Sequence, residues 1–401
     1  MMKAQAKPKR GKGEFISMLN IAVIGTGAIA PAHINGYLNF PERCNIVALC
    51  DTFPEKAQKL KEQFQLSADV VDTHKALLER EDIDLVSVCT PPYTHAEIAI
   101  DFLEAGKHVL VEKPMASSLE ECDAMNQAAY KNQRILSIVA QNRFTTPMMK
   151  LKKVLDTKLM GPIVHTQVDS YWWRGHSYYD LWWRGTWEKE GGGCTLNHAV
   201  HHIDLFQWMN GMPAEITAIT SNTSHDNAEV EDLSIAIGKY ENGSLAQITS
   251  SVVHHGEEQQ LIFQGKNARV SAPWKLKASS SKENGFPEND KSLETEIQKI
   301  YEQLPTLKYE RHAGQIDDVL TAIEENKGVL IDGEQGRKTL ELITAIYQSA
   351  SLGKTVTLPL EEDSPFYTRE GILKNATYFY EKTASIENFA SNEITTGGNY
   401  E

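Results

Sequence analysis

The chain has 401 residues, of which 41% are hydrophobic and 23% charged, and its formal net charge is −14 at pH 7. That length exceeds what a single hydrophobic core usually serves, so two domains are expected. The acidic balance argues against nucleic acid and against an anionic membrane as partners, and no apolar run is long enough to span a bilayer. We therefore expect a globular protein that acts on a small molecule.

The cysteines and the first residues bear on where the protein works. No C-x-x-C pair occurs among the five cysteines, which are Cys44, Cys50, Cys89, Cys122 and Cys194. Thiols spaced in this way favour a reducing compartment, and we expect a cytoplasmic protein. Residues 1–17 begin with a basic, polar segment that lacks the apolar core of a secretory signal, so we predict a disordered tail there.

A glycine-rich turn follows the first predicted strand, residues 19–24. The turn consists of Gly25, Thr26, Gly27, Ala28, Ile29 and Ala30, and a helical pattern comes next. Glycines at these places allow a tight turn and the close approach of a diphosphate to the N-terminus of the helix. This strand–turn–helix unit predicts a dinucleotide site.

Asp51 ends the next predicted strand, residues 46–50. A carboxylate at this position can accept hydrogen bonds from both hydroxyls of an adenosine ribose. It would repel a 2′-phosphate, which favours NAD over NADP, although the nearby Lys56 weakens that preference. The alternative role for Asp51 is to cap the helix that begins near Pro54.

Two further predicted strands, residues 84–89 and 108–111, end in polar segments. The first segment contains Thr90, Pro91, Pro92 and His95, and the second contains Glu112, Lys113 and Pro114. Repeated strand–helix units predict an α/β fold with a parallel, doubly wound sheet, whose ligands bind beyond the carboxyl ends of the strands. Lys113 can place its amine in such a site; the alternative is that Glu112 and Lys113 form a solvated pair.

The pattern changes after residue 143, where longer alternating segments predict a second, α+β domain. The predicted strands are residues 163–172, 215–222, 231–240, 244–251 and 260–264, and later helices are predicted at 313–325 and 334–352. The alternation predicts a large, open, mostly antiparallel sheet, and the polar residues 275–290 are predicted to form an exposed loop. The predicted domains are 18–143 and 144–364, with 365–401 as a C-terminal tail that wraps onto another element or subunit.

An aromatic stretch, residues 171–187, holds five of the seven tryptophans. Aromatic faces suit the C–H face of a sugar, and their polar edges tolerate water. The alternative is a core or interface cluster, because aromatic side chains favour both settings.

Residues 191–204 contain three glycines followed by a helical pattern that runs to about residue 210. Asn197, His201 and Asp204 are spaced at i, i+4 and i+7, so a continuous helix would place them on one face. His201 is the natural general base, because the unperturbed pKa of histidine lies near neutrality. A zinc site would need His198, His201 and His202 to converge, which their helical positions do not allow, so no metal is predicted.

Together these motifs resemble the glucose-fructose oxidoreductase / inositol dehydrogenase / rhizopine catabolism (Gfo/Idh/MocA) family over roughly residues 19 to 360. The resemblance is carried by the glycine turn with Asp51, by residues 90–95, by residues 105–114 with their Glu-Lys-Pro motif, by Trp183-Arg184-Gly185, and by residues 191–204. It implies a Rossmann domain followed by an α/β domain with an open sheet, through which many members form dimers or tetramers. It also implies hydride transfer between a nicotinamide cofactor and a sugar, sugar derivative or cyclitol.

The resemblance implies that Lys113 is the catalytic lysine and His201 the proton-transfer histidine. Asn197 would hold the substrate hydroxyl, at a position where many members carry an aspartate that could act as a base. The predicted cofactor contacts are Gly25, Thr26, Gly27, Ala28, Ile29, Asp51, Thr90, Pro91, Pro92, His95, Glu112, Lys113, Asn142, Trp183 and Arg184. The predicted substrate contacts are Lys113, Arg143, His176, Asn197 and His201.

Two other functions known among similar proteins remain open. Some use the same redox chemistry to cleave glycosides without net consumption of NAD, and others are sensors of sugars that have lost catalysis. The presence of both Lys113 and His201 argues against a sensor. The aromatic stretch suits a glycoside as well as a free sugar, so the sequence leaves the glycosidase alternative in place.

Overall fold

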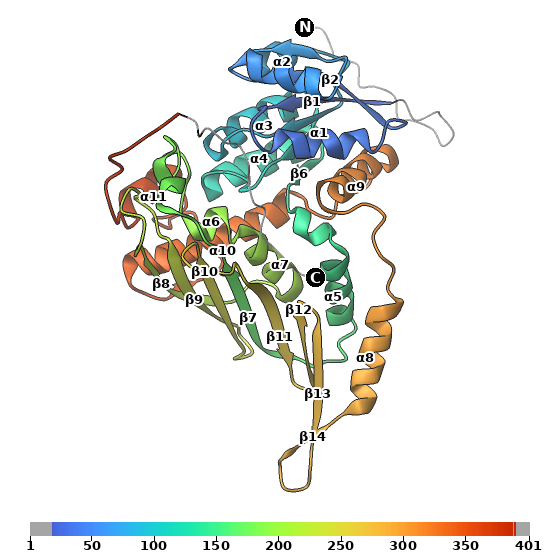
Figure 1. Cartoon of the computed structure of the whole chain (residues 1–401), viewed down its shortest axis with the longest axis vertical. Helices are drawn as coiled ribbons and strands as arrows, with labels where there is room; N and C mark the ends of the chain where they lie inside the picture. The colour runs from blue at the N-terminus through green and yellow to red at the C-terminus, as the bar shows by residue number, and fades with distance from the viewer. Residues whose placement is uncertain (1–17, 388, 390–401) are drawn as a thin grey trace.

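The computed structural model of the chain describes residues 18–387 and residue 389, and these residues form two sheets joined by long helices (Figure 1). A six-stranded sheet has the order β3-β2-β1-β4-β5-β6, and a nine-stranded sheet has the order β14-β13-β12-β11-β7-β10-β9-β8-β15. The predicted fold class, a Rossmann domain followed by a domain with a large and mostly antiparallel sheet, is confirmed. The predicted disordered tail, residues 1–17, lies outside the described residues.

The six-stranded sheet is entirely parallel and is covered by helices. Its elements are β1 (Leu19–Ile24), α1 (Ala30–Leu38), β2 (Cys44–Cys50), α2 (Pro54–Gln63), β3 (Asp69–Val71), η1 (His74–Leu77), β4 (Leu85–Val88), η2 (Pro92–Thr94), α3 (His95–Glu104), β5 (His108–Val111), α4 (Leu119–Asn132) and β6 (Leu136–Ile138). All four residues of β4 are buried, as a strand covered on both faces requires. The strand order reverses between β1 and β4, which is where such sheets bind ligands.

The second sheet begins after η3 (Gln141–Phe144) and α5 (Thr146–Asp156). Its strands are β7 (Ile163–Tyr171), β8 (Glu215–Ser221), β9 (Leu233–Lys239), β10 (Leu245–Ser251), β11 (Gln259–Gly265), β12 (Ala268–Ala272), β13 (Lys275–Ser281), β14 (Pro287–Asn289) and β15 (Val356–Thr357). Apart from the parallel pair of β7 and β10, neighbouring strands are antiparallel. In β9, buried residues alternate with exposed ones, so one face of the sheet is packed and the other is open.

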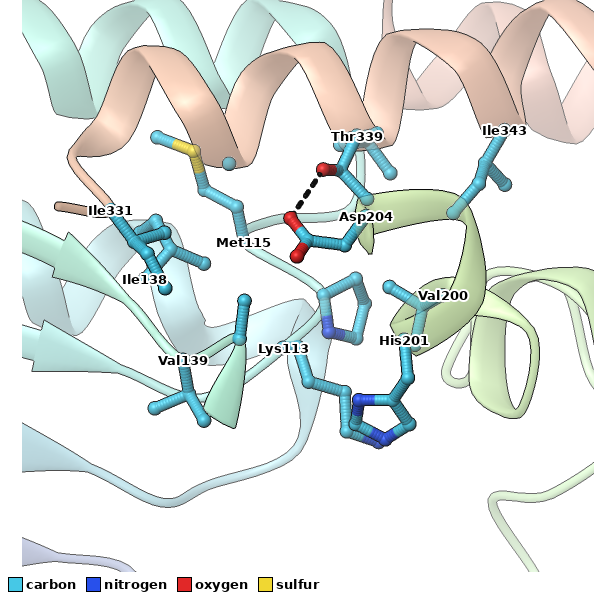
Figure 2. Close-up of a pocket in the computed structure, with 14 residues that line it drawn as sticks. Lys113, Met115, Ile138, Val139, Val200, His201, Asp204, Ile331, Thr339 and Ile343 are labelled. Atoms are coloured by element: carbon cyan, nitrogen blue, oxygen red, sulfur yellow. Dashed lines mark hydrogen bonds between the residues drawn. The ribbon is translucent and has the colours of Figure 1, made fainter. Parts of the chain in front are cut away.

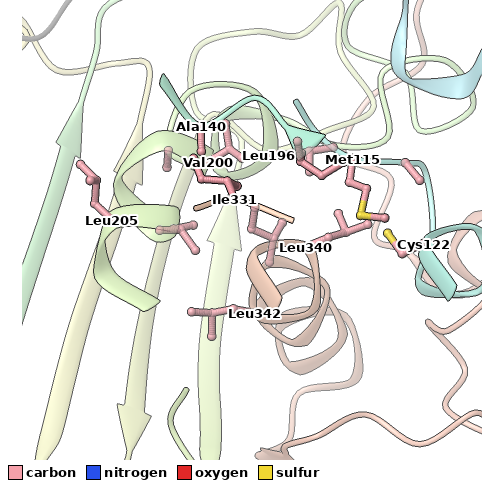
Figure 3. Close-up of a cluster of buried hydrophobic side chains, with 14 of the residues drawn as sticks. Met115, Cys122, Ala140, Leu196, Val200, Leu205, Ile331, Leu340 and Leu342 are labelled. Atoms are coloured by element: carbon pink, nitrogen blue, oxygen red, sulfur yellow. The ribbon is translucent and has the colours of Figure 1, made fainter. Parts of the chain in front are cut away.

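Helices cover the packed face of this sheet and connect it to the first domain. They are α6 (Cys194–Asn197), α7 (Val200–Asn210) and α10 (Gly333–Leu352). Figure 3 shows apolar side chains from α7, α10 and the Rossmann domain, Leu205, Leu340 and Met115 among them, gathered in one cluster. The two domains therefore share a hydrophobic core between their sheets.

Helix α9 (Arg311–Glu325) comes late in the chain but lies beside α1 of the Rossmann domain (Figure 1). Arg43 binds the carboxylates of Asp317 and Glu324, the latter at 2.9 Å. A Cβ added at Gly36 would lie 2.4 Å from Cδ1 of Ile316, which shows how closely the two helices approach. The position of α9 against the first sheet is thus set by both charge and close packing.

The prediction of an exposed loop at residues 275–290 was wrong. Strands β13 and β14 form a hairpin that extends away from the body of the molecule, and α8 (Lys291–Gln303) follows it (Figure 1). The sequence conceals this hairpin because all three residues of β14 are exposed and β13 buries only Ala278, so no apolar alternation marks it.

The C-terminal segment packs on the same chain. Phe366 is fully buried, and α11 (Arg369–Asn375) follows it. Further on, the Ile386 N–H donates to the Asp180 carbonyl at 2.8 Å, and the Trp182 N–H donates to the Ile386 carbonyl at 3.0 Å. The described part of the predicted tail therefore covers the aromatic stretch. Within the described chain, no helix is both long enough and apolar enough to cross a membrane.

Candidate functional site

The glycine turn packs directly against the end of β4. Gly25 has a φ of +87°, and a Cβ placed on it would lie 2.8 Å from the carbonyl carbon and oxygen of Cys89. Only glycine fits this backbone, both for its conformation and for the space. At Gly27 an added Cβ would meet nothing within 4 Å, so the turn presents an open surface at the N-terminus of α1. Within the described chain, no side chain caps that helix.

Asp51 braces the turn from the neighbouring strand. Its Oδ2 accepts hydrogen bonds from the N–H and hydroxyl of Thr26, both at 2.8 Å, and its Oδ1 accepts from the Phe53 N–H at 2.9 Å. Phe53 is the N-cap residue of α2 and no side-chain cap bond is formed there, so Asp51 closes the turn before this helix and does not cap it as the alternative predicted. A carboxylate offers about four lone-pair sites, so a ribose contact stays a prediction beside it.

His95 does not face the cofactor surface as predicted. Its ring is fully buried, with Nε2 2.8 Å from the Thr90 carbonyl oxygen and Nδ1 2.9 Å from the Pro114 carbonyl oxygen. Both ring nitrogens are occupied by backbone, so His95 joins the loop after β4 to the loop after β5. The prediction of a direct cofactor contact is corrected to a role in holding these two loops together.

Lys113 and His201 line the same small pocket between the two domains (Figure 2). Lys113 follows β5 of the Rossmann domain, and His201 lies in the first turn of α7. Figure 2 shows the lysine side chain running toward the imidazole, while apolar residues such as Val139 and Ile343 form other walls. Two groups that can handle protons thus meet at the carboxyl end of the parallel sheet.

The two groups affect each other's ionisation. Burial lowers the pKa of Lys113, and the Glu112 carboxylate acts in the opposite direction. Burial also lowers the pKa of His201 well below its usual value, and the charge of Lys113 lowers it further. The imidazole of His201 is therefore neutral at neutral pH, and the Glu112 carboxylate favours the ammonium form of Lys113 against the effect of burial. A neutral imidazole is the form that can take a proton.

The predicted continuous helix face of Asn197, His201 and Asp204 is wrong. Helix α6 ends at Asn197 and α7 begins at Val200, so the chain bends between the first two residues. The Asn197 amide donates to the carbonyls of Gly192 and Gly193 at 2.8 and 3.2 Å. These bonds fix the side chain and leave its amide oxygen as the end that can accept a hydrogen bond from a ligand.

Arg143 is a second correction, because it is fully buried. Its Nε and Nη2 donate to the two oxygens of Asp204 at 2.7 and 2.8 Å, and its Nη1 donates to Gln335 at 3.0 Å. Thr339 donates a further hydrogen bond to Asp204 at 2.9 Å (Figure 2). The guanidinium therefore joins η3 to α7 and α10 and does not reach a substrate, and Asp204 is not a free base.

The aromatic stretch divides into a buried and an exposed part. Trp172 and Trp187 are buried, whereas Trp173 and Trp182 are exposed. Core packing is therefore confirmed for Trp172 and Trp187, whereas contact with a sugar stays a prediction for the exposed tryptophans.

Arg184 lies between the rings of Trp183 and Tyr178, with its Cζ 4.3 and 4.2 Å from the two centroids. It also pairs with the buried Glu190 at 2.9 Å. Arg184 contributes to the electrostatic environment of Lys113. This arginine therefore belongs to the surroundings of the candidate site, and its predicted cofactor contact stays a prediction.

The remaining predicted residues lie at different depths. His176 is half exposed in η4 (His176–Asp180) and pairs with Asp226 at 2.6 Å. Asn142 lies half-buried in η3. His202 faces β7, where its Nδ1 lies 2.8 Å from Ser170 Oγ, and burial lowers its pKa to about 3. His198 instead stands against the rings of Trp172 and Tyr178.

Sequence reasoning missed two histidines that contact Glu112. His33 in α1 and His312 in α9 both place Nε2 near Oε1 of this carboxylate, at 2.9 and 3.4 Å. Glu112 itself is buried, which excludes the solvated pair with Lys113 that the sequence left open. His33 faces the sheet from α1, but His312 follows Glu112 by 200 positions, so no local signal marks that contact.

Comparison with known proteins identifies the family of the chain. Residues 19–140 match the family described as an oxidoreductase family with an NAD-binding Rossmann fold, GFO_IDH_MocA. Residues 152–358 match the C-terminal alpha/beta domain of the same family. The chain belongs to the Gfo/Idh/MocA family and is an NAD(P)-dependent oxidoreductase.

Individual relatives cover most of the chain. D-glucoside 3-dehydrogenase of Escherichia coli K12 is 26% identical over 361 residues, which are 85% of this chain and 98% of that protein. Inositol 2-dehydrogenase of Rhizobium meliloti is 23% identical over 85% of this chain and 99% of its own. The WlbA dehydrogenase of Bordetella pertussis, solved with NADH and UDP-GlcNAcA, is 27% identical with a TM-score of 0.74 and covers 86% of this chain and 99% of its own.

The buried pair of Arg143 and Asp204 gives a prediction that separates structure from substrate binding. Asp204→Asn leaves the guanidinium buried without a counter-charge and should lower the free energy of unfolding by about 3–5 kcal/mol. Thermal or chemical unfolding measures this loss. Asp82→Asn is the control, because Asp82 pairs with Arg80 at the surface and its side chain is 49% exposed. This substitution should change the free energy of unfolding by about 1 kcal/mol or less. Wild-type unfolding of D204N with an increased KM would instead make Arg143 a substrate residue.

Proposed function

We propose that the protein is an NAD-dependent dehydrogenase that oxidises a secondary alcohol of a sugar, a sugar derivative or a cyclitol. The observation that carries this proposal is the meeting of Lys113 and His201 in one pocket at the carboxyl end of β5. A dehydrogenase of alcohols needs a group that takes the hydroxyl proton and a group that stabilises the developing alkoxide. The names of the glucoside and inositol dehydrogenases among the relatives support the substrate class.

The glycine turn fits a dinucleotide. The open surface at Gly27 and the uncapped N-terminus of α1, within the described chain, would receive the diphosphate. Asp51 favours NAD, because its carboxylate lies beside the turn and would repel a 2′-phosphate. We propose Thr90, Pro91, Pro92, Asn142, Trp183 and Arg184 as further contacts. When bound, the nicotinamide supplies the acceptor for the hydride.

The protein's own residues then have separate tasks in the proposed reaction. His201, which burial and Lys113 keep neutral, takes the hydroxyl proton at a ring nitrogen. The Lys113 ammonium donates to the hydroxyl oxygen and stabilises the negative charge that forms there. Asn197, whose amide nitrogen is held by two carbonyls, orients the substrate through its amide oxygen. An asparagine cannot act as a base, so the proton falls to His201.

The test is NADH formation, followed at 340 nm, with a panel of cyclitols, aldoses and glycosides in the presence of NAD or NADP. A signal with sugars or inositols and a preference for NAD supports the proposal. Release of an aglycone from chromogenic glycosides with catalytic NAD would favour a redox glycosidase instead. Binding of NAD, seen by thermal shift, without turnover across the panel would favour a sensor.

Lys113→Ala should reduce turnover by several orders of magnitude, because the charge that stabilises the alkoxide is lost. Binding of NAD should persist, since the glycine turn and Asp51 are untouched; thermal shift with NAD measures it. Lys131→Ala, which removes an exposed lysine from the last turn of α4, serves as the matched control and should keep wild-type activity. Near-wild-type turnover in K113A contradicts the assignment.

The pH dependence follows from the direction of the pKa shift of His201. His201 can act as a base only while its imidazole is neutral. Burial and Lys113 lower its pKa well below 6.5, so the enzyme should lose activity only when the pH falls through that lowered value. The acidic limb of the kcat/KM profile should therefore lie below pH 6.5. A limb at or above pH 6.5 would indicate that another group, or a solvated histidine, is the base.

We also propose that the protein works in a reducing cytoplasm, which suits its five free cysteines. We further propose that two or four copies of the chain associate through the open face of the second sheet. Ile219 on β8 is 76% exposed and pairs across the sheet with Ile235, which is 48% exposed. Ile237 and Leu245 continue the same exposed face at 51% and 45%. Apolar residues gathered on one face of a sheet favour burial against a partner.

Ile219→Asp should convert a dimer or tetramer into a smaller species, because a carboxylate would be buried in the proposed interface. Light scattering coupled to size-exclusion chromatography measures the mass. Phe286→Asp, which changes an apolar residue that is 68% exposed between β13 and β14, is the control and should leave the mass unchanged. A monomeric wild-type protein at micromolar concentration would contradict the proposal.

A further inference from the structure

The carboxylate next to the candidate catalytic lysine is enclosed by histidines from two distant helices. Glu112 is only 5% exposed. Its Oε1 lies 2.9 Å from Nε2 of His33 and 3.4 Å from Nε2 of His312, while its Oε2 accepts from the backbone N–H of Lys113 at 3.1 Å. This set of side chains has the composition of a metal site, but its donor and acceptor atoms are already engaged with one another.

The contacts of His33 fix the direction of its hydrogen bonds. Burial lowers the pKa of His33, so its ring is neutral and carries one N–H. An ionised carboxylate can only accept, which places that proton on Nε2. Nδ1 of His33 must then accept a hydrogen bond from the hydroxyl of Ser87, which lies 3.2 Å away. The hydroxyl of Tyr37 lies 2.7 Å from Ser87 Oγ and donates to that oxygen in turn. A directed chain of donors thus supports Glu112 from the Rossmann side.

His312 supports Glu112 from the other side and belongs to a different part of the fold. It is the second residue of α9, the helix that Arg43 and the close contact at Gly36 hold against α1. Its ring centroid lies 5.2 Å from that of His33, and its side chain is 14% exposed. The packing of α9 therefore decides whether a donor reaches Glu112 from this direction.

The hydrogen bonds of the two histidines to Glu112 matter for Lys113, because Glu112 is one of the charges that set the pKa of this lysine. Burial lowers the pKa of Lys113, Glu112 and Glu190 raise it, and Arg184 lowers it. For Glu112, burial alone would raise the pKa, but the hydrogen bonds from His312 and His33 hold it well below the usual range. The carboxylate that opposes the discharge of the lysine is thus itself kept charged by the two histidines. His95, Cys89 and His201 also lie within its field.

We infer that His312 is a positioning residue, whose hydrogen bond holds the Glu112 carboxylate in the place and charge state that keep the Lys113 ammonium charged. The inference rests on the proposed role of Lys113 in catalysis. It assigns a role in the reaction to a residue that touches neither substrate nor cofactor and that follows Lys113 by almost 200 positions. It also makes the docking of α9 a condition for an active lysine.

The test measures the ionisation of Lys113 directly, so it needs no substrate. Brief labelling with acetic anhydride over a range of pH, with Lys113 acetylation quantified by peptide mass spectrometry, gives the midpoint at which the amine becomes reactive. The variants are E112Q, H312Q and H312N. The glutamine amide can occupy the place of Nε2 and donate to Glu112, whereas the asparagine amide is too short. H74A is the matched control, because His74 forms a similar pair with Asp101 at 2.8 Å, is 13% exposed, and lies beyond the distant strand β3.

We expect the midpoint to move to lower pH by about one unit in E112Q, because the Glu112 carboxylate raises the pKa of Lys113 and a nearby opposite charge shifts a pKa by about 1–3 units. H312N should show a smaller shift in the same direction, and H312Q and H74A should match the wild type. An unchanged midpoint in H312N, or equal shifts in H312N and H312Q, would overturn the inference. Thermal unfolding checks each variant; if H312N fails to fold, an unchanged midpoint in E112Q overturns it.

A second readout links the inference to turnover. With a substrate from the panel, the alkaline limb of the kcat/KM profile should move to lower pH in H312N and stay in place in H312Q. A protein that oxidises no alcohol while its Lys113 midpoint responds as expected would refute the proposed function and leave the coupling intact. Active enzyme with an unresponsive midpoint would refute the coupling alone.

Discussion

The buried pair of Arg143 and Asp204 is the interaction on which the candidate site depends. Removing both charges from water is costly. The structure offsets that cost with two direct hydrogen bonds, with a bond that Arg143 donates to Gln335 and one that Thr339 donates to Asp204, and with the ring of Trp208 5.1 Å from the guanidinium. The pair joins the last segment of the Rossmann domain to α7 and α10. Since α7 carries His201, this one contact helps to bring the histidine to the lysine of the other domain.

Two basic groups placed side by side would normally repel, and the surroundings decide which one keeps its charge. Burial and the neighbouring ammonium keep His201 neutral, while the Glu112 carboxylate opposes the loss of the proton from Lys113. The surroundings therefore favour a neutral imidazole at His201 and the charged form of the lysine. Neither domain could provide both alone, since each contributes one of the two groups.

The sequence predicted the parts of the structure whose causes are local. The turn at Gly25 and the strand ending at Lys113 are such parts, because strand periodicity and glycine spacing define them. The helix face of Asn197 and His201 was predicted wrongly, since nothing in the spacing reveals that the chain bends between α6 and α7. The family and the fold class were confirmed, whereas the specific roles of the site residues stay predictions.

Tertiary partners caused the other errors. Arg143 and His95 have the residue types of ligand contacts, but each is buried and satisfied by groups that are remote in sequence or on a neighbouring loop. The aromatic stretch likewise receives part of its support from the far end of the chain, where Ile386 bonds on both sides to residues 180 and 182. During synthesis, N-terminal segments fold first. Trp182 therefore gains its backbone partner only after Ile386 has emerged from the ribosome, so this part of the aromatic stretch is completed long after the strands around it have been made.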